Sequence, residues 1–326
     1  MIINVIGGIR ETTKLNKIMT FNAVVSLFMV KALRSLGIET NHVPYYKIYK
    51  NNPPPCDHSI LVVGSAFVEF DTRRAEKRPH IFGTTKRRQI GKTFRERIHR
   101  TTRDKVTMYI DSNYSYWDSY FDRVFTITPP KFPIEPKSDQ FVRTYGKESS
   151  KKLWVHPERY VYAGWGASPE YCYPDKNDRK TIFIDSYERG AYFEKIKNWY
   201  EIYDRVFDSL TDVKIYDYRG YTPTTKRLPW PKLQNVFRKS HFYVDPQLGV
   251  SGLTRIESAM CGCLLVTAKP MFQSWAMGQL KTATWETEEE LRKIFDSKTD
   301  PAQIHEKVKD ITWDKVAGRI VAELKR

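Results

Sequence analysis

The sequence predicts an α/β protein with two lobes, each built on a parallel β-sheet. Short buried strands recur along the chain and alternate with helices or long loops, which is the order that parallel sheets require. The chain has 326 residues and 40% hydrophobic content, enough for two packed domains of ordinary size. We expect an N-terminal lobe over residues 1–140, a crossover linker over residues 141–178 and a C-terminal lobe over residues 179–326.

The N-terminal lobe begins with a strand that runs into two glycines, Gly7 and Gly8. Apolar residues at helical spacing predict a helix over Asn22–Leu36, and Gly37 is its expected C-cap. The strands expected in this lobe are Ile2–Ile6, Ile38–Val43, Ile60–Val63, Lys105–Ile110 and Arg123–Ile127. Ligands of parallel sheets bind beyond the carboxyl ends of the strands. Gly7 and Asp111 stand at such ends and are therefore candidate site residues.

The stretch Pro129–Asp178, which includes the expected linker, is rich in Pro, Lys and aromatic residues, and a second series of strands and helices follows it. The strands expected in the C-terminal lobe are Lys180–Asp185, Val213–Tyr216, His241–Val244 and Leu264–Thr267. The expected helices are Phe193–Ser209, Lys232–Lys239, Leu253–Met260 and Glu288–Phe295, with closing helices over Pro301–Lys325.

The segment Tyr243–Thr267 carries the most specific chemical pattern of the chain, a strand, a Gly/Ser-rich turn, a helix and a buried strand. A turn of this kind presents unpaired N–H groups and the positive end of the helix dipole, which suits a diphosphate. Glu257 on the helix cannot bind phosphate because like charges repel, but its carboxylate suits a ribose diol. The alternative is a Gly turn before an ordinary amphipathic helix.

The end of this segment, Arg255–Cys263, resembles the C-terminal nucleotide-sugar signature of the GT-B glycosyltransferases. That signature usually begins with a Glu, and Gly249 stands where it would fall. Because the first Glu lies near the sugar in retaining families, its absence favours an inverting mechanism. The resemblance implies the GT-B fold, two Rossmann-like lobes with a cleft between them.

In length and order of elements, the whole chain resembles the phage β-glucosyltransferases that modify hydroxymethylated DNA bases. Val106–Asp111 has the form of the family's strand that ends in a general base. Ile182–Arg189 is similar to its diphosphate-holding turn, with one extra residue and an unexpected Glu. Arg227–Pro229 sits where the family reads the nucleobase through a backbone group. Leu253–Glu257 resembles the family's Thr-Leu-Arg pattern with its later Glu, but is one residue shorter.

The resemblance implies a role for each matching residue. Asp111 would be the general base, and UDP-glucose is the default donor because the family uses it. The implied donor-binding residues are Gly7, Gly8, Ser186, Arg189, Leu228, Ser251, Gly252, Leu253, Thr254, Arg255 and Glu257.

Each role also has a chemical basis and a structural alternative. Arg189 and Arg255 can neutralise a diphosphate leaving group through bidentate contacts. The alternatives are a solvated turn residue for Arg189 and a salt bridge on the helix surface for Arg255. An inverting transfer needs one base to take the acceptor proton, which suits Asp111. The alternative for Asp111 is a turn or helix N-cap.

The formal net charge of +16 is unevenly placed along the chain. Twelve Lys or Arg residues lie between Thr72 and Arg103, opposed only by Glu76 and Glu96. Such clustering is typical of a surface that binds a polyanion, usually nucleic acid. The alternatives are a solvated basic loop, an anionic membrane patch and a site for an acidic glycan. The expected DNA-binding residues are Arg73, Arg74, Lys86, Arg87, Arg88, Lys92, Arg95, Arg97 and Arg100.

Other features bound the compartment and the cofactors. The four cysteines show no metal-ligand spacing and no disulfide framework, which fits a reducing cytoplasm. The N-terminal residues form a strand rather than a signal peptide, and no apolar run is long enough for a membrane span. We expect a cytoplasmic monomer with no tightly bound cofactor. A requirement for Mg²⁺ or Mn²⁺ is left open, because no metal motif stands out.

These observations favour an enzyme that transfers a sugar, by default glucose, from a nucleotide sugar to a hydroxymethylated base of double-stranded viral DNA. The first alternative is the same chemistry on a cell-envelope or other glycan. The second is a non-enzymatic nucleic-acid-binding protein on a Rossmann-like scaffold.

Overall fold

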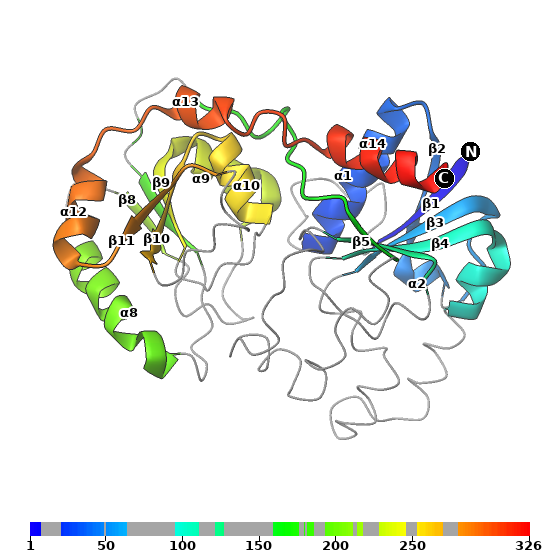
Figure 1. The fold of residues 1–326 in the computed structure, drawn as a ribbon, viewed down its shortest axis with the longest axis horizontal. Helices are drawn as coiled ribbons and strands as arrows, with labels where there is room; N and C mark the ends of the chain where they lie inside the picture. Colours follow the sequence, from blue (N-terminus) through cyan, green and yellow to red (C-terminus); the bar gives the residue numbers. More distant parts are fainter. Residues whose placement is uncertain are drawn as a thin grey trace. The chain divides into compact units, whose positions relative to one another are not determined.

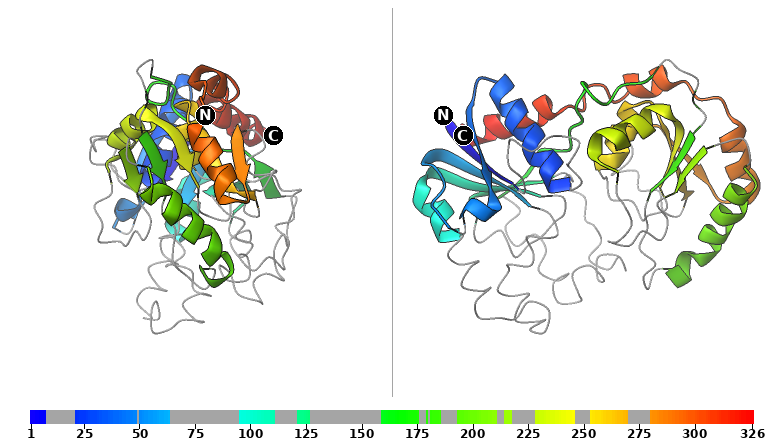
Figure 2. Two further views of the ribbon diagram at one scale, coloured as in Figure 1. Left: turned by 90° about the vertical axis from the view of Figure 1, so that its left-hand side faces the viewer. Right: turned by 180° about the vertical axis from the view of Figure 1, so that it is seen from behind.

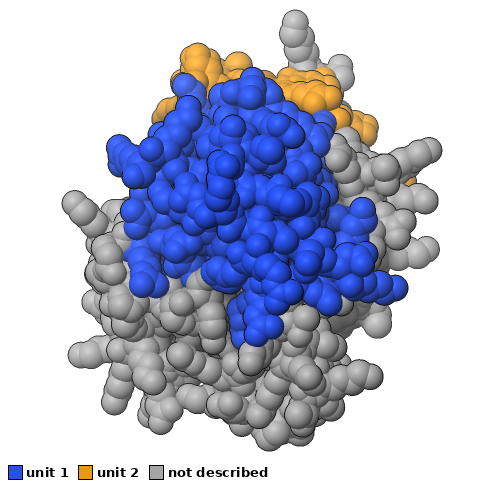
Figure 3. All heavy atoms as spheres, turned by 90° about the vertical axis from the view of Figure 1, so that its right-hand side faces the viewer, with its two compact units in different colours: residues 1–164, 313–326 blue, residues 165–312 orange. Residues whose placement is uncertain are grey.

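The computed structural model describes the chain as two compact units, shown in blue and orange in Figure 3. Unit 1 comprises residues 1–164 and 313–326, and unit 2 comprises residues 165–312. The residues described are 1–7, 21–48, 50–63, 95–110, 121–126, 159–175, 179, 181–185, 193–210, 214–217, 228–245, 253–269 and 280–326.

Unit 1 contains a six-stranded sheet of order β2-β1-β3-β4-β5-β6, in which every neighbouring pair is parallel (Figure 1). Its strands are β1 (Ile2–Gly7), β2 (Glu39–Pro44), β3 (Cys56–Val63), β4 (Thr102–Ile110), β5 (Arg123–Thr126) and β6 (Tyr160–Tyr162). Strand β1 has buried apolar side chains on both faces: Ile3, Val5 and Ile6 are all fully buried. Such runs are typical of strands covered on both sides in a parallel sheet.

Helix α1 (Phe21–Ser35) follows β1 and ends as its sequence predicts. Gly37 adopts a φ of 74°, and the N–H groups of Gly37 and Ile38 donate to the carbonyls of Arg34 and Leu33. This pair of bonds is the Schellman motif, which places glycine in the left-handed conformation. The predicted C-cap at Gly37 is confirmed.

Gly7 ends β1 where α1 passes close to the sheet. A Cβ atom at this position would collide with the side chain of Ser26 on α1 and would lie 3.4 Å from His42 Nε2. The glycine therefore allows close packing of helix on strand, whatever part it has in binding.

The last helix, α14 (Trp313–Leu324), packs against α1 in unit 1 (Figures 1 and 2). Its apolar stripe, which includes Val316 and Ile320, is buried. The sequence analysis placed all of residues 179–326 in one lobe, and the structure differs for this segment. The amphipathic pattern of α14 indicates that one face is covered, but the pattern does not say by which sheet. Likewise, β6 lies within the expected linker yet pairs with β5.

Unit 2 contains a five-stranded sheet of order β11-β10-β9-β7-β8, again parallel throughout. Its strands are β7 (Thr181–Ile184), β8 (Lys214–Asp217), β9 (Ser240–Val244), β10 (Leu264–Ala268) and β11 (Thr282–Trp285). Its helices are α8 (Phe193–Asp208), α9 (Trp230–Lys239), α10 (Leu253–Met260), α12 (Glu288–Asp296) and α13 (Pro301–Glu306). Unit 1 adds a short helix, α2 (Tyr45–Ile48), and residues 95–101 are also helical.

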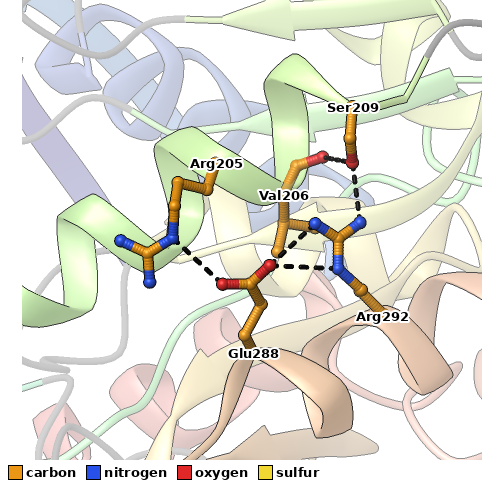
Figure 4. Close-up of polar contacts among 5 residues, drawn as sticks. All are labelled: Arg205, Val206, Ser209, Glu288 and Arg292. Carbon is orange, nitrogen blue, oxygen red and sulfur yellow. Dashed lines mark hydrogen bonds and ion pairs between the residues drawn. The ribbon is translucent and has the colours of Figure 1, made fainter.

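Helices α8 and α12 lie side by side and are joined by a polar cluster (Figures 1 and 4). Glu288 accepts from Arg292 at 2.8 Å and from Arg205 at 3.0 Å. Arg292 also donates to Ser209 Oγ at 2.7 Å. These bonds hold the pKa of Glu288 below its usual value, with Arg292 the larger cause. The cluster is exposed, so it orients the two helices and adds little stability.

Within the described ranges, none of the helices combines the length and apolar character needed to cross a bilayer.

Candidate functional site

The strand order of unit 2 marks one position in its sheet. The chain runs from β7 outward to β8 and then back past β7 to β9, so the direction of winding reverses between β7 and β9. Ligands of open parallel sheets bind beyond the carboxyl ends of the strands at such a reversal. The strands are in register here, with Ile184 opposite Val244.

Two aspartates stand at this edge. Asp185 directly follows β7, and its N–H donates to the Val244 carbonyl at 3.0 Å. Asp245 directly follows β9, and its N–H donates to the Val266 carbonyl at 2.8 Å. The backbone bonds extend the sheet by one residue on each strand, so both carboxylates are held at the point of reversal.

A hydroxyl pair links Asp185 to the start of α10. The hydroxyl of Tyr243 donates to Asp185 Oδ2, and it lies 2.9 Å from Thr254 Oγ1 in the first turn of α10. Burial, with the nearby Asp185 carboxylate as a smaller cause, raises the pKa of Tyr243 well above its ordinary value. Tyr243 therefore stays a neutral donor.

Asp245 is paired with Arg255 of α10. Arg255 Nε donates to Asp245 Oδ2, and the two residues are 4% and 0% exposed. Burial lowers the pKa of Arg255, but the Asp245 carboxylate more than offsets this, so the net shift is upward. The buried pair anchors α10 to the end of β9, and loss of either partner would leave an uncompensated charge. Binding of a diphosphate by Arg255 stays a prediction.

Glu257 is enclosed between α9 and α10. Its side chain is 1% exposed and accepts two hydrogen bonds of 2.8 Å, from Trp230 Nε1 to Oε1 and from Gln234 Nε2 to Oε2. Burial raises the pKa of Glu257 to about 8, and the two hydrogen bonds partly oppose this rise. Glu257 is thus mostly neutral at pH 7. Its contact with a ribose stays a prediction.

The amide of Gln234 is itself oriented by a third residue. Cys172 Sγ donates to Gln234 Oε1 at 3.2 Å, which turns the amide nitrogen toward Glu257. Trp230 and Gln234 are four residues apart on α9 and so lie on one face of the helix. The four side chains form a buried chain of contacts from residues 159–175 through α9 to α10.

The carboxyl-terminal ends of α9 and α10 are tied together by a buried arginine. Arg179 Nη1 donates to the Ser240 carbonyl at 3.0 Å, and Nη2 donates to the Cys261 carbonyl at 2.6 Å. A cation is favourable at helix carboxyl ends, where carbonyl groups lack partners. Arg179 thereby helps to hold the two helices that enclose Glu257.

The structure brings together part of the predicted donor site. Thr254, Arg255 and Glu257 lie on α10, Leu253 begins it with a buried side chain, and Leu228 lies two residues before α9. Gly7 lies in unit 1. The remaining predicted residues, Gly8, Asp111, Ser186, Arg189, Ser251 and Gly252, lie outside the described residues.

The sequence analysis did not single out Asp185, Asp245, Tyr243, Trp230 or Gln234 as site residues. A signal for the two aspartates was present, because each directly follows an apolar strand as Asp111 does. The side chains that surround Glu257 gave no such signal, because their contacts with it join residues 23 and 27 positions apart.

Three of the predicted DNA-binding residues are described, and their surroundings differ. Arg97 is half-buried and its Nη1 donates to the Ile48 carbonyl at 2.7 Å. Arg95 is half-buried and Arg100 is exposed. Arg100 is thus the most accessible of the three. The other predicted contacts, Arg73, Arg74, Lys86, Arg87, Arg88 and Lys92, lie outside the described residues.

Among the described residues, no group of three or more His, Cys, Asp or Glu side chains could hold a metal ion.

Comparisons with known proteins identify the fold. No family model and no curated protein matches this sequence. A Listeria monocytogenes protein assigned as a UDP-N-acetylglucosamine 2-epimerase matches with a TM-score of 0.54 at 12% identity, covering 99% of this chain and 95% of that chain. The Anabaena protein HepE, solved in complex with UDP-glucose, matches with a TM-score of 0.51 at 9% identity over 100% and 99% of the two chains.

Sucrose-phosphate synthase from Thermosynechococcus elongatus matches with a TM-score of 0.50 at 10% identity, covering 99% of this chain and 98% of that chain. At such identities the likeness concerns the fold alone. The predicted fold class is confirmed: the chain is an α/β protein with two parallel sheets and the two-lobed GT-B-like fold.

Proposed function

We propose that this protein is a glycosyltransferase that binds a nucleotide-sugar donor at the carboxyl edge of the unit 2 sheet. The proposal rests on one observation: α10 starts at the edge of the sheet where the strand order reverses between β7 and β9. Asp185, Tyr243 and Thr254 bond to one another there, and Asp245 holds Arg255 beside them. A helix start at a sheet reversal supports diphosphate binding, because unpaired N–H groups and the helix dipole favour an anion.

In this proposal the donor is a UDP-sugar, by default UDP-glucose. The diphosphate meets the start of α10, with Arg189 and Arg255 neutralising the charge of the leaving group. The ribose diol bonds to Glu257, and the base is read beside Leu228. Two of the similar structures are described with UDP-linked compounds, one as a UDP-N-acetylglucosamine epimerase and one in complex with UDP-glucose, which supports the choice of nucleotide.

For the acceptor we propose DNA, and the partition of charge between the units supports this. Unit 1 carries 32 Lys and Arg residues against 17 Asp and Glu, a net charge of +15. Unit 2 carries 22 against 21, a net charge of +1. A chain with one strongly basic unit and one nearly neutral unit favours a polyanionic acceptor, bound through its phosphates by the basic unit.

The proposed chemistry is an inverting displacement. Asp111 takes the proton of a hydroxymethyl group on the base, the freed oxygen attacks the anomeric carbon, and the nucleoside diphosphate leaves from the opposite face. β4 ends at Ile110, so Asp111 directly follows a strand of the basic unit. Gly249, in place of the Glu of retaining families, is the reason for expecting inversion.

The test is a transfer assay with radiolabelled nucleotide sugars and duplex DNA, hydroxymethylated or unmodified, with and without Mg²⁺ or Mn²⁺. We expect label in hydroxymethylated DNA alone, with inverted configuration. The Asp111→Asn variant should lose about a hundredfold or more in turnover while it keeps donor affinity.

Three outcomes would contradict parts of the proposal. Label in a glycan but not in DNA would move the acceptor to the cell envelope. Conversion of the nucleotide sugar to an epimer without any acceptor would replace transfer by epimerisation. Failure to bind any nucleotide sugar would remove the donor site.

A further inference from the structure

The carboxyl group of Glu257 is enclosed within unit 2 and bonds only to neutral donors among the described residues. Its two hydrogen bonds come from neutral donors, the indole of Trp230 and the amide of Gln234. Among the described residues, no charged side chain contributes to its pKa. A carboxyl group in such surroundings is held neutral, because the two hydrogen bonds compensate only part of the lost hydration of its ionised form.

Side chains of α9 and of residues 159–175 enclose Glu257. Trp230 and Gln234 occupy one face of α9, and Cys172 fixes the amide of Gln234 so that its nitrogen points at Glu257. Tyr171 packs edge-on against Trp230, with ring centroids 5.0 Å apart. Each oxygen of Glu257 accepts one hydrogen bond and has capacity for a second, which is what two ribose hydroxyls require.

We propose that nucleotide binding is proton-linked and that Trp230 and Gln234 are positioning residues that set its pH range: burial between α9 and α10 keeps Glu257 neutral, the two donors orient its carboxyl group and favour its ionised form, and the bound nucleotide takes that ionised form with release of one proton. The proposal rests on the proposed donor site. It adds a regulation of that site, since donor affinity then depends on pH in the neutral range.

Three other titratable side chains lie near Glu257, two thiols and the phenol of Tyr171. Cys172 interacts with Glu257 from residues 159–175, and Cys261 at the end of α10 lies 3.9 Å from Gln234 Oε1. Burial raises the pKa of Cys172 well above its ordinary value, so this thiol keeps its proton. Burial likewise raises the pKa of Tyr171, on the far side of Trp230.

Calorimetric titration with UDP-glucose between pH 6 and pH 10 tests the proposal. A nucleotide sugar is used because the terminal phosphate of free UDP itself titrates near pH 6, on the order of other phosphate monoesters. For the wild type we expect affinity to rise about tenfold per pH unit below pH 8 and then to level off. Titrations in two buffers of different ionisation enthalpy should show about one proton released at pH 7.

The variants Trp230→Phe and Gln234→Met each remove one donor while keeping the volume close. Hydrogen bonds to a carboxylate favour its ionised form, so each variant should move the pH midpoint upward by about 1–2 units. The matched control is Trp285→Phe, which removes a buried indole bond of 3.1 Å to Tyr203 in the same unit. The control should leave the midpoint unchanged.

An affinity independent of pH, or equal shifts in Trp230→Phe and Trp285→Phe, would overturn the proposal. Infrared titration of the unliganded protein tests the positioning claim separately from the assignment of the donor site. The Glu257→Gln variant identifies the infrared band of the Glu257 carboxyl group. If no nucleotide sugar binds but the band titrates near pH 8 and moves in Trp230→Phe, the positioning claim holds and the donor site fails. A band that titrates below pH 6 would overturn the positioning claim itself.

Discussion

At the scale of single residues, the side chain that was predicted to bind ribose is a buried carboxylic acid in the structure. The pKa of Glu257 is raised to about 8 from an ordinary value of 4.5. Between these values the unfolded chain releases the proton and the folded protein keeps it. Stability from this residue is therefore complete below pH 4.5 and is lost as the pH rises toward 8.

The Glu257→Gln variant removes this titration and keeps the shape of the side chain. Relative to the variant, the wild type should lose stability steadily between pH 5 and pH 8, by a few kcal/mol in all, at about 1.4 kcal/mol per pH unit. Urea unfolding of both proteins at several pH values measures the difference, in which the titrations of all other groups cancel. A constant difference across this range would show that Glu257 is ionised in the folded protein.

At the scale of elements, glycine decides how α10 ends and β10 begins. Gly262 has a φ of 85°, and the N–H groups of Gly262 and Cys263 donate to the carbonyls of Ala259 and Ser258. This is the same Schellman motif that ends α1. The chain can therefore turn from the helix into the buried strand Leu264–Ala268 within three residues. The spacing Cys-Gly-Cys thus reflects tight packing, and both cysteines are fully buried.

A pair of identical substitutions tests the need for glycine at this turn. In Gly262→Ala the new Cβ would lie 2.7 Å from Pro301 Cβ and 2.8 Å from the Pro301 carbonyl. We expect a loss of about 1–3 kcal/mol, from backbone strain and this clash together. Gly318 lies within α14 with no atom within 4 Å of a new Cβ, so Gly318→Ala should add about 0.5–1 kcal/mol. Thermal unfolding measures both, and equal effects would refute the turn argument.

At the scale of the whole molecule, the two units divide the charge and, we propose, the substrates. Unit 1 carries nearly all of the excess of Lys and Arg over Asp and Glu. The polar edge at β7 and β9 lies in the nearly neutral unit 2. Such a partition lets a polyanion bind one unit without competing for the donor site of the other.

Salt titration of duplex DNA binding tests this division. Affinity of the wild type should fall by about three to five powers of ten between low and moderate salt, if six to ten phosphates are engaged. The triple variant Arg87→Ser, Arg88→Ser, Arg100→Ser should weaken binding and flatten the salt slope by roughly one unit per lost contact.

The control for this experiment removes the same charge from unit 2. Lys269, Lys293 and Lys309 are exposed there, and each pairs only at the surface with a glutamate. The triple Lys→Ser control should leave DNA affinity nearly unchanged. Equal losses in both triple variants would mean that net charge alone drives binding, and a flat salt dependence would exclude a phosphate-contacting surface.

The sequence by itself determined the local structure of most elements. Apolar runs and helical spacing located β1, α1, β4, α8, α10 and β10 to within a few residues. Glycine after a helical pattern located the end of α1. These signals are local, because hydrogen-bonding period and backbone conformation depend on residues a few positions apart. The short strands β6 and β11 escaped, since three or four residues show little periodicity and are defined by pairing with distant strands.

Only the tertiary structure decided which elements share a core and which side chains share a site. The apolar stripe on α14 indicated that one face of this helix is buried. That this face packs on α1 was not predictable, because the two helices are almost the whole chain apart in sequence. The motif around Arg255 predicted a diphosphate ligand. Its pairing with Asp245 could not be predicted, because it depends on the position of α10 relative to the end of β9. Glu257 has a carboxyl group in any context. Its neutrality comes from burial, which the hydrogen bonds from Trp230 and Gln234 only partly offset, because protonation depends on surroundings that no local pattern specifies.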